Sequence, residues 1–108
     1  MSGAWKQIER TVAALTGGVR TWDSRDAIDV ITDEYAIEVK NVKGPTIAQC
    51  EAWLRHNEPK AAGRGLKNAL IVKRRAGRGT STPFLAVFPL GFTDENDSGK
   101  GTLNEPAV

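Results

Sequence analysis

The chain has 108 residues, of which 40% are hydrophobic and 26% charged, and its formal net charge is +2. This composition is that of one globular domain and excludes global disorder. A single Cys and a single His exclude a disulfide framework and a structural zinc site, so Cys50 is expected to be a small buried or half-buried residue in a reducing cytoplasm. No apolar run approaches the roughly 18 residues of a membrane span, and the amino terminus lacks a signal-peptide core.

The charge is unevenly distributed. Residues 93–108 have few apolar residues and a net charge of −3, so we expect a flexible tail after a domain at residues 1–92 that holds the remaining +5. The segment 59–78 has no acidic residue and carries seven basic ones: Lys60, Arg64, Lys67, Lys73, Arg74, Arg75 and Arg78. Such a stripe suggests a phosphate-backbone partner, and a generic solvated surface is the alternative.

The first elements in chain order are a helix and a short strand. Residues 4–16 predict a helix that ends at Gly17-Gly18, with one buried stripe: Trp5, Ile8, Val12 and Leu15. A short strand at 19–22 and a polar turn at 23–25 follow.

Residues 26–43 are the most informative stretch. The segments 26–32 and 35–42 have the β-branched, period-two character of strands, with Asp33-Glu34 as the tip of a hairpin. This register places Asp29 opposite Glu38 and puts Lys40 on the same face. The other face is the predicted core face, and the charged face is predicted to be the less buried one. The members of the core face are Ile28, Val30, Ile37 and Val39.

A second helix and two further strands complete the domain. Residues 46–57 predict a helix whose apolar side is Ile47, Cys50, Trp53 and Leu54. A basic loop at 59–66 follows, then strands at 68–73 and 84–90 joined by a loop at 75–83. This order predicts an α/β fold with a mixed sheet and a helix packed on each side.

The opposed acids need an explanation, because like charges directly across two strands destabilise a sheet. Either both carboxylates are solvated, or a divalent cation lies between them. Two carboxylates suit Mg²⁺ or Mn²⁺, and such an ion activates water and neutralises charge on a phosphate, which Lys40 would assist. Glu9 lies at the edge of the first helix's buried stripe and is either a solvated carboxylate or a third ligand. His56 is expected to be a surface residue.

The motifs WKQIER, GGVR, DAID and IEVK together resemble the PD-(D/E)XK nuclease superfamily, most closely its archaeal-type and phage Holliday junction resolvases. The resemblance covers about residues 4–54 and departs from the pattern at Ile28, where the family has proline. It implies a restriction-endonuclease-like fold, a Mg²⁺-dependent endonuclease that resolves four-way DNA junctions, a homodimer, and a cytoplasmic location (the host's, if a phage encodes it). The alternatives are a nuclease of this fold that cuts flaps, forks or single strands, and a non-catalytic nucleic-acid-binding module.

The resemblance also implies residue roles. The acidic metal site would comprise Glu9, Asp29 and Glu38 with the Val39 carbonyl, and Lys40 would be the catalytic lysine. Ser24 and Gln49 would be accessory residues. Trp53, Leu54 and Phe84 would belong either to the core or to a dimer interface. The basic residues expected to contact DNA are Arg10, Arg20, Arg25, Lys43, Lys60, Arg64, Lys67, Arg74, Arg75 and Arg78.

Overall fold

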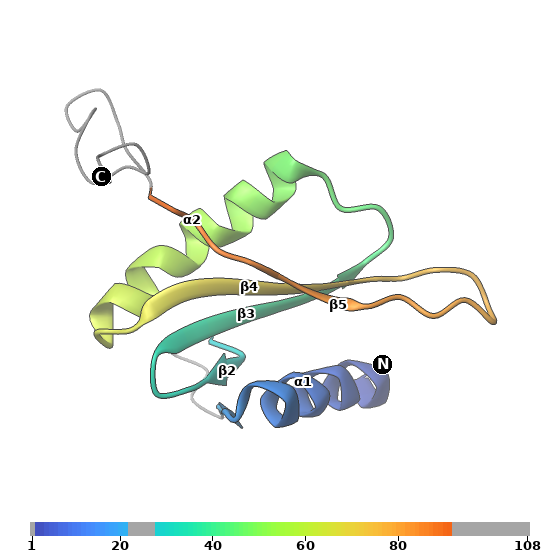
Figure 1. Cartoon of the computed structure of the whole chain (residues 1–108), viewed down its shortest axis with the longest axis horizontal. Helices are drawn as coiled ribbons and strands as arrows, with labels where there is room; N and C mark the ends of the chain where they lie inside the picture. Colours follow the sequence, from blue (N-terminus) through green and yellow to red (C-terminus); the bar gives the residue numbers. More distant parts are fainter. Residues whose placement is uncertain (1, 22–27, 92–108) are drawn as a thin grey trace, which may run out of the picture.

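The computed structural model describes residues 2–21 and 28–91 and contains two helices and five strands in one mixed sheet (Figure 1). The elements are α1 (Ser2–Thr16), β1 (Val19–Arg20), β2 (Val30–Ile31), β3 (Tyr35–Val42), α2 (Ile47–Gly63), β4 (Lys67–Arg74) and β5 (Phe84–Val87). The predicted α/β class and the predicted order of elements are confirmed. The predicted turn at 23–25 and the predicted tail at 93–108 lie outside the described residues.

The strands lie in the sheet in the same order as in the chain, from β1 to β5. All neighbours are antiparallel except β3 and β4, which run parallel and are connected by α2. Helix α1 lies against β1, β2 and β3 on one face, and α2 lies against β3 and β4 on the other (Figure 1). The hairpin register is confirmed, because Val30 pairs with Ile37 and Ile31 with Ala36.

Helix α1 ends where the two glycines predict. Gly17 has φ of 76°, and the N–H of Gly18 donates to the carbonyl of Ala13 at 2.9 Å, as in a Schellman cap. Val12 is buried in the core, but Leu15 is 67% exposed and Trp5 36% exposed, so the predicted four-residue stripe is wrong at both ends. The strands beneath α1 include two that are only two residues long, so they offer the helix little surface to cover.

Helix α2 is longer than predicted. It begins in a capping box in which Thr46 and Gln49 satisfy each other's backbone N–H groups, and it continues through Pro59 to Gly63. The loop predicted at 59–66 is therefore wrong over most of its length. A proline lacks one helical N–H donor, but buried Asn57 and Ala61 on either side of Pro59 hold the helix against the sheet.

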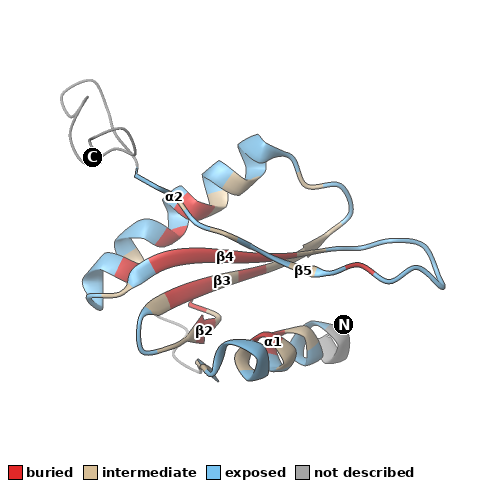
Figure 2. Ribbon diagram, in the orientation of Figure 1, coloured by how far each residue is buried: buried red, intermediate tan, exposed pale blue. Residues whose placement is uncertain are grey.

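The buried residues of the sheet are concentrated on the central strands β3 and β4 (Figure 2), and they lie on both faces. Under α1, Val12 packs with Val30, Ile37, Val39 and their neighbours on β4. Under α2, Leu54 packs with Leu70 and Val72, with Cys50 and Trp53 half-buried beside them. The charged face of the hairpin, predicted to be the less buried one, is thus covered by α2. Ile47, predicted in the apolar side of α2, is 77% exposed in the first helical turn.

Ile28 lies on the face opposite to the predicted one. It packs with Ala36 and Ala61 on the α2 side, whereas strand alternation would put it with Val30. Alternation fails because β2 contains only Val30 and Ile31. Within the described residues, neither helix has the length and apolar composition needed to cross a membrane.

Two buried asparagines connect α2 to the sheet. The Asn57 amide donates to the carbonyl of Ala36 at 3.0 Å and to Oδ1 of Asn68 at 2.9 Å. The Asn68 amide donates in turn to the carbonyl of Leu54 at 2.7 Å and to Glu58 at 2.9 Å. Because buried polar groups are costly when unpaired, this cluster fixes the position of α2 along β3 and β4.

Replacing Asn57 with Leu should reduce the free energy of unfolding by about 2 kcal/mol, because Ala36 and Asn68 would each keep a buried acceptor without its donor. Urea denaturation followed by circular dichroism measures the change. His56→Ala, at an exposed position on the same helix, is the control and should change the stability by less than about 0.5 kcal/mol. Equal stability of the two variants would contradict a role for the cluster.

Candidate active site

The pairing of β2 with β3 stops at Val30, and the side chain of Asp29 takes over where the ladder ends. In a continuing antiparallel ladder the N–H of Val39 would donate to the carbonyl of Ile28. That carbonyl instead accepts a hydrogen bond from the hydroxyl of Thr21, and the Val39 N–H donates to Oδ2 of Asp29 at 2.8 Å. The carboxylate of Asp29 is therefore held against the backbone between Glu38 and Lys40.

Glu38 and Lys40 lie on the same face of β3, as predicted, and form an ion pair with 3.2 Å between Lys40 Nζ and Glu38 Oε2. Their side chains are only 28% (Lys40) and 12% (Glu38) exposed. The ammonium of Lys40 also lies 5.3 Å from the ring centroid of Trp53 on α2, within the range of a cation–π contact. The sequence pattern indicated only a core or dimer-interface role for Trp53, and it could not predict this contact because the contact joins two elements.

Burial raises the pKa of Asp29 from its ordinary 3.8 to about 7. The hydrogen bond from Val39 and the charge of Lys40 act in the opposite direction, while the negative charges of Glu38 and Glu9 raise the pKa further. Without a cation, Asp29 is therefore protonated below about pH 7 and ionised above it, and a positive charge bound there would favour the ionised form.

Glu9 is buried and acts on Asp29 through its charge, but it is engaged elsewhere. Its Oε1 accepts a hydrogen bond from Nε of Arg20 at 3.0 Å. The described residues contain no group of three carboxylate, His or Cys side chains that could bind one metal ion. The predicted set of three acids is thus not assembled, since Glu9 and Arg20, both predicted site residues, bind each other.

The remaining predicted site residues are dispersed. Ser24 and Arg25 lie outside the described residues. The side chain of Gln49 caps α2, with its Oε1 accepting from the N–H of Thr46 at 3.0 Å. Arg10 is exposed on α1, and His56 is exposed on α2, the latter as predicted.

The basic segment 59–78 is divided in space. Lys60, Arg64 and Lys67 lie at the end of α2 and the start of β4. Arg74, Arg75 and Arg78 lie at the other end of β4 or beyond it, about 23 Å away at the rise of a β-strand. The basic residues of this segment therefore form two separate groups in space.

Arg74, Arg75 and Arg78 lie at the edge of the sheet where the parallel strands β3 and β4 both end. Lys43, directly after β3, lies at the same edge. Val42 pairs with Arg74, and the N–H of Arg75 donates to the carbonyl of Val42 at 2.7 Å. Lys43 and Arg75 line one hollow of about 370 Å³. We call Lys43, Arg74, Arg75 and Arg78 the carboxyl-edge group, and all four are exposed.

Lys73, between the two groups, has a structural role. Its ammonium donates to the carbonyl of Thr82 at 2.7 Å and to the hydroxyl of Thr82 at 3.0 Å, and it lies 5.1 Å from the ring centroid of Phe84. These contacts fix the loop after β4 against the sheet.

Comparisons with protein-family models, with curated proteins and with solved structures found no match to this chain. The function of the chain is therefore inferred from the geometry and charge of the site.

The pKa of Asp29 predicts a dependence of stability on pH. Because the pKa is higher in the folded chain than in the unfolded one, the folded state is stabilised below about pH 4 and loses that stabilisation as the pH rises to about 7. Asp29→Asn should therefore raise the free energy of unfolding at pH 8, by at most about 4 kcal/mol, and leave it nearly unchanged at low pH.

Urea titrations in EDTA across this pH range measure the effect. Asp33→Asn, at the exposed tip of the hairpin, is the matched control and should show no such gain. An Asp29→Asn variant that is no more stable than the parent chain at pH 8 would contradict the burial of this carboxyl.

Proposed function

We propose that this chain is a Mg²⁺-dependent DNA endonuclease of restriction-endonuclease-like fold that cuts branched DNA, in the manner of a Holliday junction resolvase. The observation that carries the proposal is the opening of the β2–β3 ladder at Asp29, which brings its carboxylate to the backbone beside Glu38 and Lys40.

The residues at the opening fit a small divalent cation. Asp29 and Glu38 supply carboxylate oxygens, and the Val39 carbonyl faces the same side of β3 as the N–H that Asp29 binds. Two carboxylates with a carbonyl suit Mg²⁺ or Mn²⁺, which keep several waters. The negative charges of Glu38 and Glu9, which act on Asp29, also favour a cation at this place. When bound, the ion would supply an activated water and neutralise charge on the phosphate.

In the proposed hydrolysis, Lys40 would act electrostatically on the attacking water and on the phosphate. In this reaction a water oxygen attacks phosphorus and gives up a proton to solvent, the P–O bond to the leaving strand breaks, and the leaving oxygen takes up a proton from solvent. The ammonium of Lys40 would orient the attacking water and stabilise the charge that builds on the phosphate. Glu38 and the ring of Trp53 hold this ammonium from two sides.

The carboxyl-edge group extends the positive charge beyond the site. On the α2 face, Lys40 pairs with Val72, and Arg74 follows two residues later on the same face. A DNA backbone that enters at the sheet edge would contact these side chains before it reaches Lys40. Resolution of a four-way junction needs two coordinated cuts, so the proposal includes a two-fold homodimer.

Glu38→Gln should lower Mg²⁺-dependent cleavage of a four-way DNA junction by about two orders of magnitude or more, because a carboxylate ligand is lost while the shape is kept. Binding of the junction in EDTA should persist. Glu51→Gln, at an exposed acid on α2, is the control and should cleave normally.

Junction, flap, single-stranded and linear duplex DNA should be compared in the same assay. Paired symmetric nicks confined to the junction support a resolvase. Preferred cleavage of flaps or single strands would contradict the junction as substrate but keep the nuclease chemistry. Binding without any cleavage would contradict the nuclease proposal itself.

Arg75→Gln should weaken DNA binding and lower the slope of log affinity against log salt by about one, because one phosphate contact is lost. Fluorescence anisotropy at several salt concentrations measures the slope. Lys6→Gln, an exposed basic position on α1 outside the proposed DNA path, is the matched control. Equal slopes for Arg75→Gln and the parent chain would contradict a contact between the carboxyl-edge group and DNA.

A further inference from the structure

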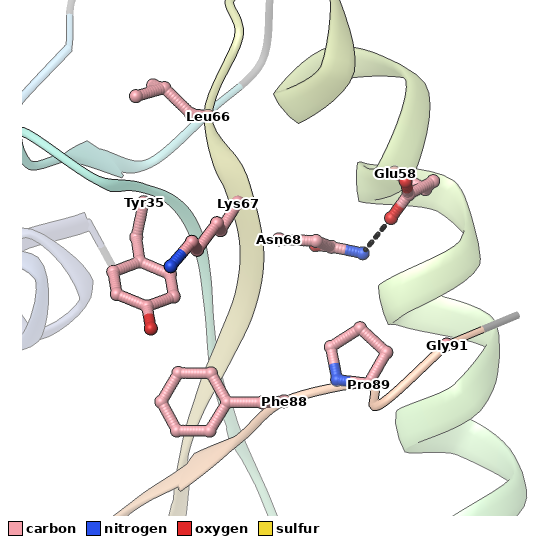
Figure 3. Close-up of a pocket in the computed structure, with 8 residues that line it drawn as sticks. All are labelled: Tyr35, Glu58, Leu66, Lys67, Asn68, Phe88, Pro89 and Gly91. Carbon is pink, nitrogen blue, oxygen red and sulfur yellow. Dashed lines mark hydrogen bonds between the residues drawn. The ribbon is translucent and has the colours of Figure 1, made fainter. Parts of the chain in front are cut away.

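A second hollow lies at the opposite end of the sheet from the carboxyl-edge group. The pairing of β5 with β4 stops at Val87 and Leu70, and the chain then leaves the sheet through Phe88 and Pro89. A cavity of about 460 Å³ opens there, beside the start of β4 (Figure 3). Its volume is within the range of about 300–1,000 Å³ that is typical of small-ligand sites.

One side of this cavity is aromatic. The rings of Tyr35 and Phe88 are 5.4 Å apart between centroids and tilted by 49°. Phe88 is 50% exposed, so the pair presents ring surface to whatever enters the hollow (Figure 3). An exposed aromatic surface of this kind suits a flat, stacking ligand.

The charged side chains of the cavity differ between its two walls, with a lysine beside the aromatic pair and a glutamate opposite. The ammonium of Lys67 lies 5.9 Å from the ring centroid of Tyr35, and its only ion pair within the described residues is a long one of 3.8 Å to Glu34, with both side chains more than two-thirds exposed. Such a pair is weak, so Lys67 is able to turn to another anion. On the far wall, the Glu58 carboxylate accepts from Asn68 at 2.9 Å, and its negative charge disfavours a phosphate within the cavity.

The cavity is also within reach of the site. Tyr35 begins β3, and Glu38 and Lys40 follow three and five residues later on the same strand, which corresponds to about 10–17 Å. That distance corresponds to about three to five nucleotides of one DNA strand, at about 3.4 Å per nucleotide. Glu58 and Asn68, on the far wall, lie on the α2 side of the sheet with Glu38 and Lys40, whereas Tyr35 and its pairing partner Lys67 lie on the α1 side. A DNA strand that joins the cavity to the site would therefore cross the end of the sheet.

We propose that this cavity binds one unpaired base of the DNA substrate, stacked on Phe88 and Tyr35, with its phosphate at Lys67. This inference rests on the proposed function for the identity of the ligand as DNA. It adds a physical basis for structure selectivity, because a base in a regular duplex is already stacked and paired and cannot enter, whereas bases at a branch or in a single strand are accessible.

Tyr35 is the one tyrosine of the sequence, so labelling tyrosine rings with ¹³C gives a single reporter within the cavity. The full chain is titrated in EDTA, where no cleavage occurs, with a short single-stranded oligonucleotide and with the fully paired duplex of the same strand. The Tyr35 ring signals should move upfield with the single strand and stay in place with the duplex. Unchanged Tyr35 signals at saturating single strand would overturn the inference.

Phe88→Leu keeps an apolar side chain and removes the exposed ring. It should weaken binding of the single strand by about tenfold, as expected for the loss of one base-stacking contact, and leave binding of the duplex unchanged. Trp5→Leu, at a partly exposed aromatic on α1 outside the cavity, is the control and should change neither. An equal loss of affinity for the duplex, or no loss for the single strand, would also overturn the inference.

The two proposals fail in different ways. If no DNA is cleaved in Mg²⁺ but the single strand still shifts Tyr35, the nuclease proposal fails and the base site stands. If junctions are cleaved, but the Tyr35 ring signals do not move and Phe88→Leu binds the single strand as tightly as the parent chain, the base site alone fails. If neither oligonucleotide binds, the base site fails, and the junction cleavage assay alone decides the nuclease proposal.

Discussion

The hydrogen bond from the N–H of Val39 to the carboxylate of Asp29 is the constraint on which the rest of the candidate site depends. Where β2 leaves β3, a backbone donor would lose its partner, and a buried N–H must be satisfied. Asp29 satisfies it with a side chain rather than with the backbone. The same contact places a carboxylate in a partly buried position beside Glu38, and burial in turn raises the pKa of Asp29.

The protonation state of Asp29 links the stability of the sheet to the proposed binding of a cation. A protonated Asp29 is tolerated in the sheet without a cation, whereas an ionised one needs a positive partner close by. Lys40 supplies part of that charge but is held by Glu38 and Trp53. The proposed cation site and the proposed phosphodiester hydrolysis both depend on these contacts of Asp29, Glu38 and Lys40.

Much of the fold could be predicted from local pattern. The order of elements, the bounds of β3, the glycine end of α1 and the hairpin register all follow from periodicity and turn residues over short windows. The errors share one cause. The extent of α2 through Pro59, the side on which Ile28 packs, and the engagement of Glu9 by Arg20 each depend on a partner from another part of the chain. Local periodicity contains no information about such partners.

The sequence by itself determined the register of the hairpin and the shared face of Glu38 and Lys40, because side chains alternate along a strand and the hairpin tip fixes the register. Only the tertiary structure decided that this face is covered by α2, that β2 ends at the aspartate, and that the basic segment divides into two groups at opposite ends of the sheet. The physical reason is that burial and the end of pairing depend on what packs against a strand, whereas alternation depends on the strand alone.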